Sequence, residues 1–146
     1  ITMALKQSLH ALGTIPMPLP TGPGLCAVRT TYTLTADLAV GDILEMGFIP
    51  ANCVPVDLIL DSDDLGTTGT LSVGLLNTGK TDLDSTWLAA SDVNTAATAY
   101  RADAAGLLAM SRISATNTQR PYGVKLATDT TATTGTVGLT LVYRLA

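Results

Sequence analysis

Charged and aromatic residues are both scarce in this chain of 146 residues. Charged residues make up 14% of the sequence and aromatic residues 4%, whereas soluble domains usually carry about 25% charged residues. Hydrophobic residues reach 47%, and the mean hydropathy is +0.36. Because a disordered chain needs low hydrophobicity and high charge, this composition excludes disorder. It also argues against a free, highly soluble monomer, whose surface would carry more charge.

The chain also lacks a basic stripe and a long apolar run. Its eight lysines and arginines are scattered along the sequence, and the formal net charge is −4. We therefore do not expect direct binding to nucleic acid, which requires clustered positive charge. No apolar run approaches the ~18 residues that a membrane span needs, and residues 1–6 do not have the layout of a signal peptide. We therefore expect no membrane partner.

Residues that carry catalytic or metal chemistry are few. His10 is the only histidine, and the two cysteines, Cys26 and Cys53, lie in apolar segments that resemble strands. Catalytic triads and zinc sites need clusters of such residues, and no Walker loop or dinucleotide fingerprint is present. We expect a protein that is not an enzyme and that uses no cofactor or metal. The cysteines are interpreted as small hydrophobic residues in a reducing compartment.

What the sequence does contain begins with a proline-rich segment at residues 1–24. Residues 15–24 read Ile-Pro-Met-Pro-Leu-Pro-Thr-Gly-Pro-Gly. Because each proline fixes φ and lacks an N–H group, this segment is neither a helix nor a central strand. Ile15, Met17 and Leu19 alternate with the prolines, so the segment is apolar. It predicts an extended arm that lies against an apolar surface, either its own domain or a neighbouring subunit.

After the arm, apolar and polar residues alternate with the period of two that is typical of strands. The expected strands span residues 26–35, 42–48, 54–60, 70–76, 108–114, 122–128 and 135–144. The strand at 54–60 is expected to turn Val54, Val56, Leu58 and Leu60 inward. In the alanine-rich residues 82–108 we expect one or two short helices or irregular turns.

This pattern predicts an all-β fold. About seven strands, many threonines and little helix indicate an antiparallel sandwich or barrel. Long connections outnumber tight hairpins, which favours a jelly roll. The predicted organisation is an extended arm at residues 1–24 and a jelly-roll-like antiparallel β-sandwich at residues 25–146, with one or two short helices.

Carboxylates form the strongest lead for a site. Asp57, Asp61, Asp63 and Asp64 lie close together in the sequence. Residues 61–66 resemble the start of a calcium loop, but Ser72 stands where the loop needs its bidentate glutamate. Aspartates at such corners often accept backbone N–H groups in Asx turns. Turn capping, a subunit contact and calcium binding all stay open.

The few aromatic residues allow two interpretations. Trp87, Tyr100 and Tyr122 are scattered, and together they could form a platform for a carbohydrate or serve as packing anchors in the core. The second interpretation fits a chain with so few aromatic residues better, because large side chains dominate core packing. The first one requires these side chains to be exposed.

Several stretches carry a resemblance to a known family. They are AVGDILEMGFIPANCVPVDLILDSDDL at residues 39–65, LSVGLL at 71–76, the segment 87–108 with YRADAAG, and GTVGLTLVYR at 135–144. Together these stretches span most of residues 30–144. They resemble the small capsid decoration, or cement, proteins of tailed bacteriophages, especially those on the heads of short-tailed phages.

The resemblance implies a structural protein with a jelly-roll-like fold and no enzymatic activity. Such a protein is made in the cytoplasm of the host bacterium and lies on the outer surface of the virion as a homodimer or homotrimer. There it binds the major capsid protein across subunit junctions. The alternative function is a carbohydrate-binding module, or a tail or fibre component of a virion. The residues expected at the interface are Ile15, Met17, Leu19, Pro20, Asp61, Asp63 and Asp64.

Overall fold

The computed structural model describes residues 3–20, 22, 24–94 and 97–146. Predictions that fall on Ile1, Thr2, Thr21, Pro23, Thr95 and Ala96 lie outside the described residues. They concern parts of the arm and of the alanine-rich segment.

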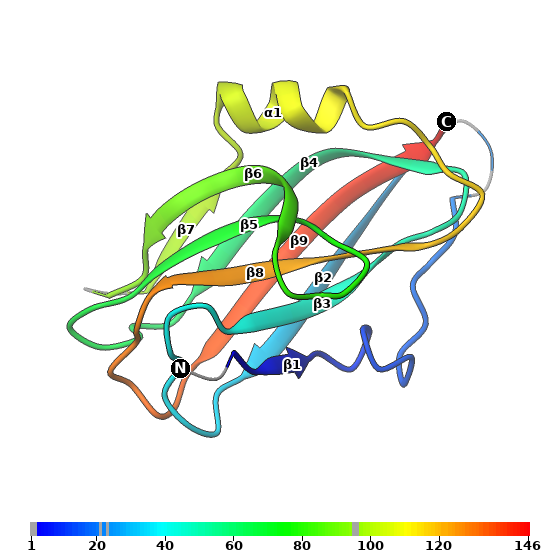
Figure 1. Ribbon diagram of the computed structural model, residues 1–146. Coiled ribbons are helices and arrows are strands. Elements are labelled where there is room, and N and C mark those ends of the chain that lie inside the picture. Colours follow the sequence, from blue (N-terminus) through cyan, green and yellow to red (C-terminus); the bar gives the residue numbers. More distant parts are fainter. Residues whose placement is uncertain (1–2, 21, 23, 95–96) are drawn as a thin grey trace.

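The described residues form nine strands and one helix, arranged as two sheets that pack face to face (Figure 1). The strands are β1 (Leu5–Gln7), β2 (Leu25–Thr33), β3 (Ile43–Ile49), β4 (Cys53–Ser62), β5 (Thr70–Leu76), β6 (Leu83–Asp92), β7 (Thr98–Arg101), β8 (Arg120–Thr128) and β9 (Thr136–Leu145), and the helix is α1 (Ala104–Ser111). One sheet has the order β1-β3-β8-β5-β6 and the other β2-β9-β4-β7. Across these ranges, no helix is long and apolar enough to cross a membrane.

The strands pair in a nested pattern. β2 pairs with β9, β3 with β8, β4 with β7 and β5 with β6, all of them antiparallel. Successive pairs alternate between the two sheets, which is the arrangement of a jelly roll. The predicted jelly-roll-like sandwich is therefore confirmed. β1 lies outside this pattern, because it adds to the edge of β3 as a parallel strand.

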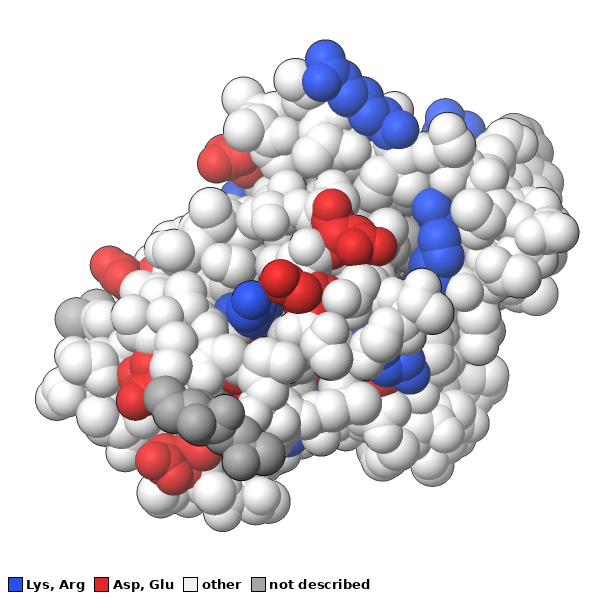
Figure 2. Space-filling view, in the orientation of Figure 1, with Lys and Arg blue, Asp and Glu red and all other residues white. Residues whose placement is uncertain are grey.

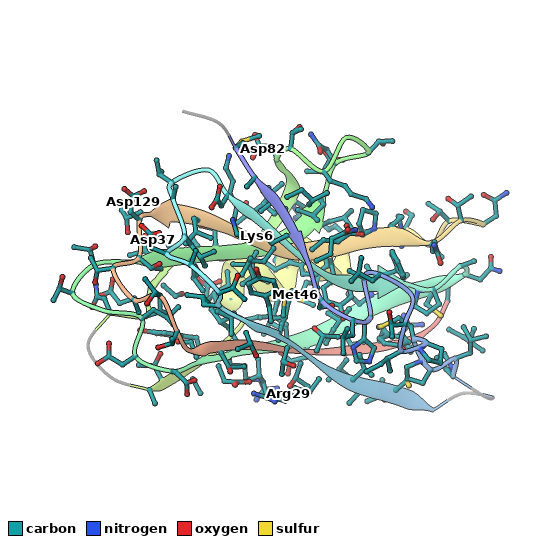
Figure 3. All side chains as sticks on the ribbon, turned by 90° about the horizontal axis from the view of Figure 1, so that it is seen from below. Lys6, Arg29, Asp37, Met46, Asp82 and Asp129 are labelled. Atoms are coloured by element: carbon teal, nitrogen blue, oxygen red, sulfur yellow. The ribbon has the colours of Figure 1, made fainter. Side chains whose placement is uncertain are left out.

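The core lies between the two sheets. In β9, the side chains of Val137, Leu139, Leu141 and Tyr143 are all buried, as the period-two alternation predicts. Met46 projects into the same space from the facing sheet (Figure 3). Each such side chain contributes roughly 1.5–3 kcal/mol when it is fully buried. The core therefore supplies the stability that the few charges cannot.

A β-bulge in β4 changes which side chains face the core, so the predicted inward face holds for only part of the strand. The register between β4 and β9 shifts between Pro55 and Asp57. Beyond the bulge Leu58 and Leu60 are buried as predicted, but before it Val54 is only half-buried and Pro55 is buried. One extra residue in a strand exchanges the two faces, because side chains alternate with a period of two.

The alanine-rich segment contains a long strand that the sequence does not predict. β6 spans Leu83–Asp92, and its register with β5 shifts three times along its length. These shifts break the alternation that marks a strand. The expected strand at 108–114 is wrong, because residues 104–111 form α1. The helix begins after Asp103, whose side chain accepts the N–H of Gly106 at 2.7 Å and caps the first turn.

The position of α1 depends on one glycine. Gly106 is buried, and a Cβ atom at this position would lie 1.7 Å from the carbonyl oxygen of Trp87 in β6. The helix backbone therefore contacts the strand directly. Any side chain at position 106 would push α1 away from β6 and open the core around Trp87.

We expect the substitution Gly106→Ala to lower the free energy of unfolding by about 1–3 kcal/mol, as overpacking does. Helix propensity alone would give the opposite sign, since alanine stabilises a helix interior by about 0.5–1 kcal/mol relative to glycine. Gly79→Ala is the matched control, because no atom lies within 3.7 Å of a Cβ there. Urea denaturation of both variants measures the difference. A stabilised Gly106→Ala variant would contradict the close contact.

Candidate functional site: the N-terminal segment and its apolar surface

A buried carboxylate holds the start of the N-terminal segment on the sandwich. Asp42 lies just before β3, and its side chain is only 4% exposed. It accepts the N–H of Ala4 at 2.9 Å and the N–H of Ala39 at 3.1 Å. The Lys6 ammonium lies 3.0 Å from the same carboxylate. Burial by itself raises the pKa of Asp42, but these hydrogen bonds and the lysine outweigh it and lower the pKa below its usual value.

A second buried carboxylate continues this attachment along β3. Glu45 is fully buried, and it accepts a hydrogen bond from Nε2 of Gln7 at 2.8 Å. The ammonium of Lys80 lies 2.9 Å from its other oxygen. β1 is thus fixed to β3 by charged contacts as well as by the backbone ladder. Hydrogen bonds to charged groups are worth roughly 1.5–3 kcal/mol each.

The chain then makes a compact turn that points leucines outward. The Ser8 hydroxyl donates to the Met46 carbonyl and accepts the N–H of Ala11 at 3.1 Å. Ser8 and Ala11 are both buried, but the side chains of Leu9 and Leu12 are 52% and 58% exposed. The turn therefore presents apolar residues to the surroundings while its own backbone stays anchored.

The proline-rich part of the arm, residues 15–20, follows the turn and lies on its own domain. The carbonyl of Pro18 accepts a hydrogen bond from the hydroxyl of Tyr143, and Met17 packs against the core. Ile15 and Leu19 are 41% and 67% exposed. The arm was expected to lie against either its own domain or a neighbouring subunit, and its described residues contact its own domain. The division of the chain at residue 24 stays a prediction.

A groove of about 530 Å³ runs between the arm and the end of β3. The arm contributes Leu12 and Ile15 to its walls, and Phe48 lies on the opposite side. Among the described residues that line it, His10 is the single titratable group. Burial lowers the pKa of His10, so the imidazole is neutral at pH 7. The groove therefore offers an uncharged and mostly apolar surface, with Asn117, Thr118 and Gln119 as its polar part.

The predicted aspartates do not converge on one point. Asp61 accepts hydrogen bonds from the guanidinium of Arg29 on the outer face of the β2-β9-β4-β7 sheet, where Figure 3 shows Arg29. Asp57 pairs in the same way with Arg101. Both arginines have raised pKa values because of these hydrogen bonds. These two carboxylates are therefore neutralised by partners within the chain.

Of the other two aspartates, only Asp64 caps a turn. It accepts the N–H of Gly66, two residues on, at 2.9 Å, which is the Asx-type capping that was one of the open interpretations. Asp63 accepts the N–H of Thr136, the first residue of β9, at 2.8 Å and so ties the end of β4 to β9. Within the part of the chain that the structure describes, no group of three His, Cys, Asp or Glu residues is placed to hold a metal ion. The aspartates shape the loop, and their role as a contact stays a prediction.

The aromatic residues do not form an exposed platform. Trp87 and Tyr122 are fully buried in the core, and the hydroxyl of Tyr100 donates to the carbonyl of Asp92. The packing interpretation is confirmed for the first two. A carbohydrate site built on these side chains is wrong, because neither buried ring can stack on a sugar.

Sequence reasoning missed part of the apolar surface. Leu5, Leu9, Leu12 and Leu25 are all at least 46% exposed; the first three lie inside the predicted arm at residues 1–24, and Leu25 follows it directly. Their spacing alone does not separate exposed from buried leucines. The one available signal is the lack of charge nearby, since residues 7–28 contain no Lys, Arg, Asp or Glu. Figure 2 likewise shows charged residues as separate spots on a largely uncharged face.

The match to known proteins comes from solved structures. No protein-family model and no curated protein sequence matches the chain. A chain in the structure of the capsid of Ralstonia phage GP4 is 38% identical to it, with a TM-score of 0.84, and the match covers 98% of this chain and 99% of that one. The chain belongs to this family of phage capsid proteins. A chain of the cyanophage Pam1 capsid asymmetric unit is 18% identical with a TM-score of 0.60, over 90% of this chain and 93% of that one, and it shows the same fold.

Membership in the family gives this capsid protein a structural role in a virion. Its surroundings there are other capsid subunits. A protein held among such subunits keeps part of its surface covered, and exposed apolar residues then cost little. The scarcity of charge and the exposed leucines of the N-terminal segment fit that setting.

We expect Asp42→Asn to lower the free energy of unfolding by about 1–3 kcal/mol at pH 7, because the amide removes the charge that binds Lys6 and leaves buried partners poorly paired. The folded-state pKa of Asp42 is depressed, so its stabilisation is present above the unfolded pKa and is lost as pH falls through the folded pKa. The difference between wild type and variant should therefore shrink in acid.

Urea denaturation between pH 7 and pH 2 measures this difference. Asp37→Asn is the matched control, since Asp37 is exposed. An Asp42→Asn variant as stable as wild type at pH 7 would show that the carboxylate does not hold the segment.

Proposed function

We propose that this capsid protein decorates the outer surface of a phage shell and cements it by binding the major capsid protein across subunit junctions. The observation that carries the proposal is the anchored, uncharged and leucine-rich surface of the N-terminal segment. It is combined with 38% identity to a capsid chain over nearly the whole length. An apolar surface on a virion protein indicates contact with another subunit.

The turn and arm supply the contact. Leu12, Ile15 and Leu19 are exposed at the groove, and Leu9 is exposed in the same turn as Leu12. Met17 packs the arm against the core. Pro20 is half-buried beside them. This arrangement gives a stiff apolar surface that needs little ordering when it docks, and pre-organisation lowers the cost of binding.

Many identical copies make a modest contact sufficient. Each copy that spans a junction links neighbouring subunits, and binding at one subunit raises the effective concentration at the next. A shell under internal pressure is then held by the sum of many junctions. The second proposed contact is the corner at the end of β4, with Asp61 in the strand and Asp63 and Asp64 just after it. Hydrogen bonds from Thr136 and Gly66 to the last two aspartates hold this corner.

Removing the protein from the particle tests the cementing role. Particles that lack it should lose DNA or collapse at lower temperature, and on treatment with a chelator, than complete particles. Adding the purified protein back should restore resistance, and it should bind expanded heads rather than immature ones. Particles that are equally resistant without it would show that it does not cement the shell.

Substitution in the turn locates the contact. We expect Leu12→Asp to weaken binding to protein-free expanded heads by tenfold or more, because burying an unpaired carboxylate costs more than ~1.4 kcal/mol. Leu108→Asp in α1 is the matched control, with a side chain 49% exposed away from the arm. Cosedimentation with heads measures both. Equal binding by the two variants would remove the turn from the interface.

A further inference from the structure

Two side chains of β3 are buried on the outer face of the five-stranded sheet. Leu44 and Met46 belong to the core, so Ile43 and Glu45 point to the opposite face, because side chains alternate along a strand. An outer face of a sandwich is usually in contact with water, yet Ile43 is 1% exposed and Glu45 is fully buried. Other parts of the chain therefore cover this region of β3 from outside.

The cover consists of the N-terminal segment and the loop between β5 and β6. The loop, residues 77–82, crosses in front of β8 toward β3 (Figure 1), and its ion pairs reach Lys125 of β8 and Glu45 of β3. The loop and the segment meet around a small cavity of about 110 Å³. The residues that line it are Met3, Ala4 and Leu5 from the segment, Gly79, Lys80 and Thr81 from the loop, and Ile43 from β3.

Glu45 is held by both parts of this cover. Its Oε2 accepts a hydrogen bond from Nε2 of Gln7 in β1 at 2.8 Å, and the ammonium of Lys80 in the loop lies 2.9 Å from its Oε1. In the described part of the chain no hydrogen bond reaches Oε1, so the charge of Lys80 compensates this oxygen. A buried carboxylate that loses its counter-charge is strongly destabilised. Glu45 can therefore stay buried beneath β1 only while Lys80 is in place.

The backbone of the loop holds Lys80 in position. The side-chain oxygen of Asn77 accepts the N–H of Thr81 at 2.9 Å, and the N–H of Asn77 donates to the carbonyl of Asp82 at 2.9 Å. These two hydrogen bonds close the loop. Lys80 itself has a φ of 55°, in the left-handed region that favours glycine, although Gly79 stands directly before it. Residues persist in this conformation where the surrounding contacts hold them.

We propose that Lys80 is a positioning residue for the N-terminal segment, and that the β5–β6 loop is a latch that keeps β1 on β3. Without the ammonium of Lys80, the carboxylate of Glu45 must regain water, and the smallest part of its cover is β1, with three residues. β1 then opens, and the turn and arm that follow it lose their fixed starting point. The inference does not depend on binding to the major capsid protein.

Hydrogen exchange of the isolated full chain tests the latch. The reporter is the amide of Ser8, which donates to the carbonyl of Glu45 at 2.9 Å, and the reference is the amide of Asp63, which donates to the carbonyl of Thr136 at 3.0 Å. Lys80→Met removes the charge and keeps the length of the side chain. We expect it to speed exchange at Ser8 by about tenfold or more and to leave exchange at Asp63 unchanged, because the opening is local.

Two further variants separate the charge of Lys80 from the packing of the loop. Lys80→Arg keeps the charge and should keep the protection of Ser8. Lys125→Met is the matched control, because it breaks the pair with Asp82 in the same loop and leaves the pair at Glu45 intact. Surface pairs contribute little, so exchange at Ser8 should stay within about twofold of wild type. Unchanged exchange at Ser8 in Lys80→Met, or equal acceleration at Ser8 and Asp63, would overturn the latch.

A double-mutant cycle tests whether Lys80 acts through Glu45. Glu45→Gln removes the buried charge and keeps the shape of the side chain, so the ammonium of Lys80 has no carboxylate to compensate. Adding Lys80→Met to Glu45→Gln should then change exchange at Ser8 by less than about twofold, although the same substitution in wild type speeds it by about tenfold or more. Equal effects in the two backgrounds would show that Lys80 does not position β1 through Glu45.

Discussion

The buried carboxylates of Asp42 and Glu45 determine how the N-terminal segment lies on the sandwich. They hold β1 against β3, so that the five-stranded sheet ends in a short, anchored strand and not in the bare edge of β3. The turn at Ser8 and the arm at Pro18 are attached in sequence after it. Because these contacts are polar, several apolar side chains of the same segment are left to face outward.

Polar contacts anchor the N-terminal segment while its apolar side chains face outward, and this arrangement fits a sequence with few charges and many hydrophobic residues. A jelly roll of this size buries enough apolar area between its two sheets to fold without disulfides, and both cysteines are free thiols. The apolar residues beyond the core lie on the turn, the arm and the start of β2, where subunit contacts would cover them. Charged residues are few, and some of them form ion pairs on the surface, such as Arg29–Asp61.

The sequence predicts those strands in which buried and exposed side chains alternate without interruption. β9 keeps a regular alternation from Val137 to Tyr143, and its buried face follows directly. β4 and β6 contain bulges, which shift the faces and which no periodicity reveals. α1 confirms the short helix expected in residues 82–108, but the helix continues to Ser111, where the apolar residues from Leu108 onward wrongly predict a strand. The arm was predicted from its prolines, but its contact with Tyr143 joins residues 125 positions apart and depends on the tertiary fold.

We propose that this capsid protein lies on the outside of a shell and joins the subunits beneath it. A cryo-electron microscopy reconstruction of the source particle tests this most directly. The account predicts density for the sandwich on the outer surface, over junctions of the major capsid protein, with the turn and arm at residues 9–20 buried against neighbouring subunits. Density for the chain only inside the shell or in the tail, or an arm fully exposed to solvent, would contradict it.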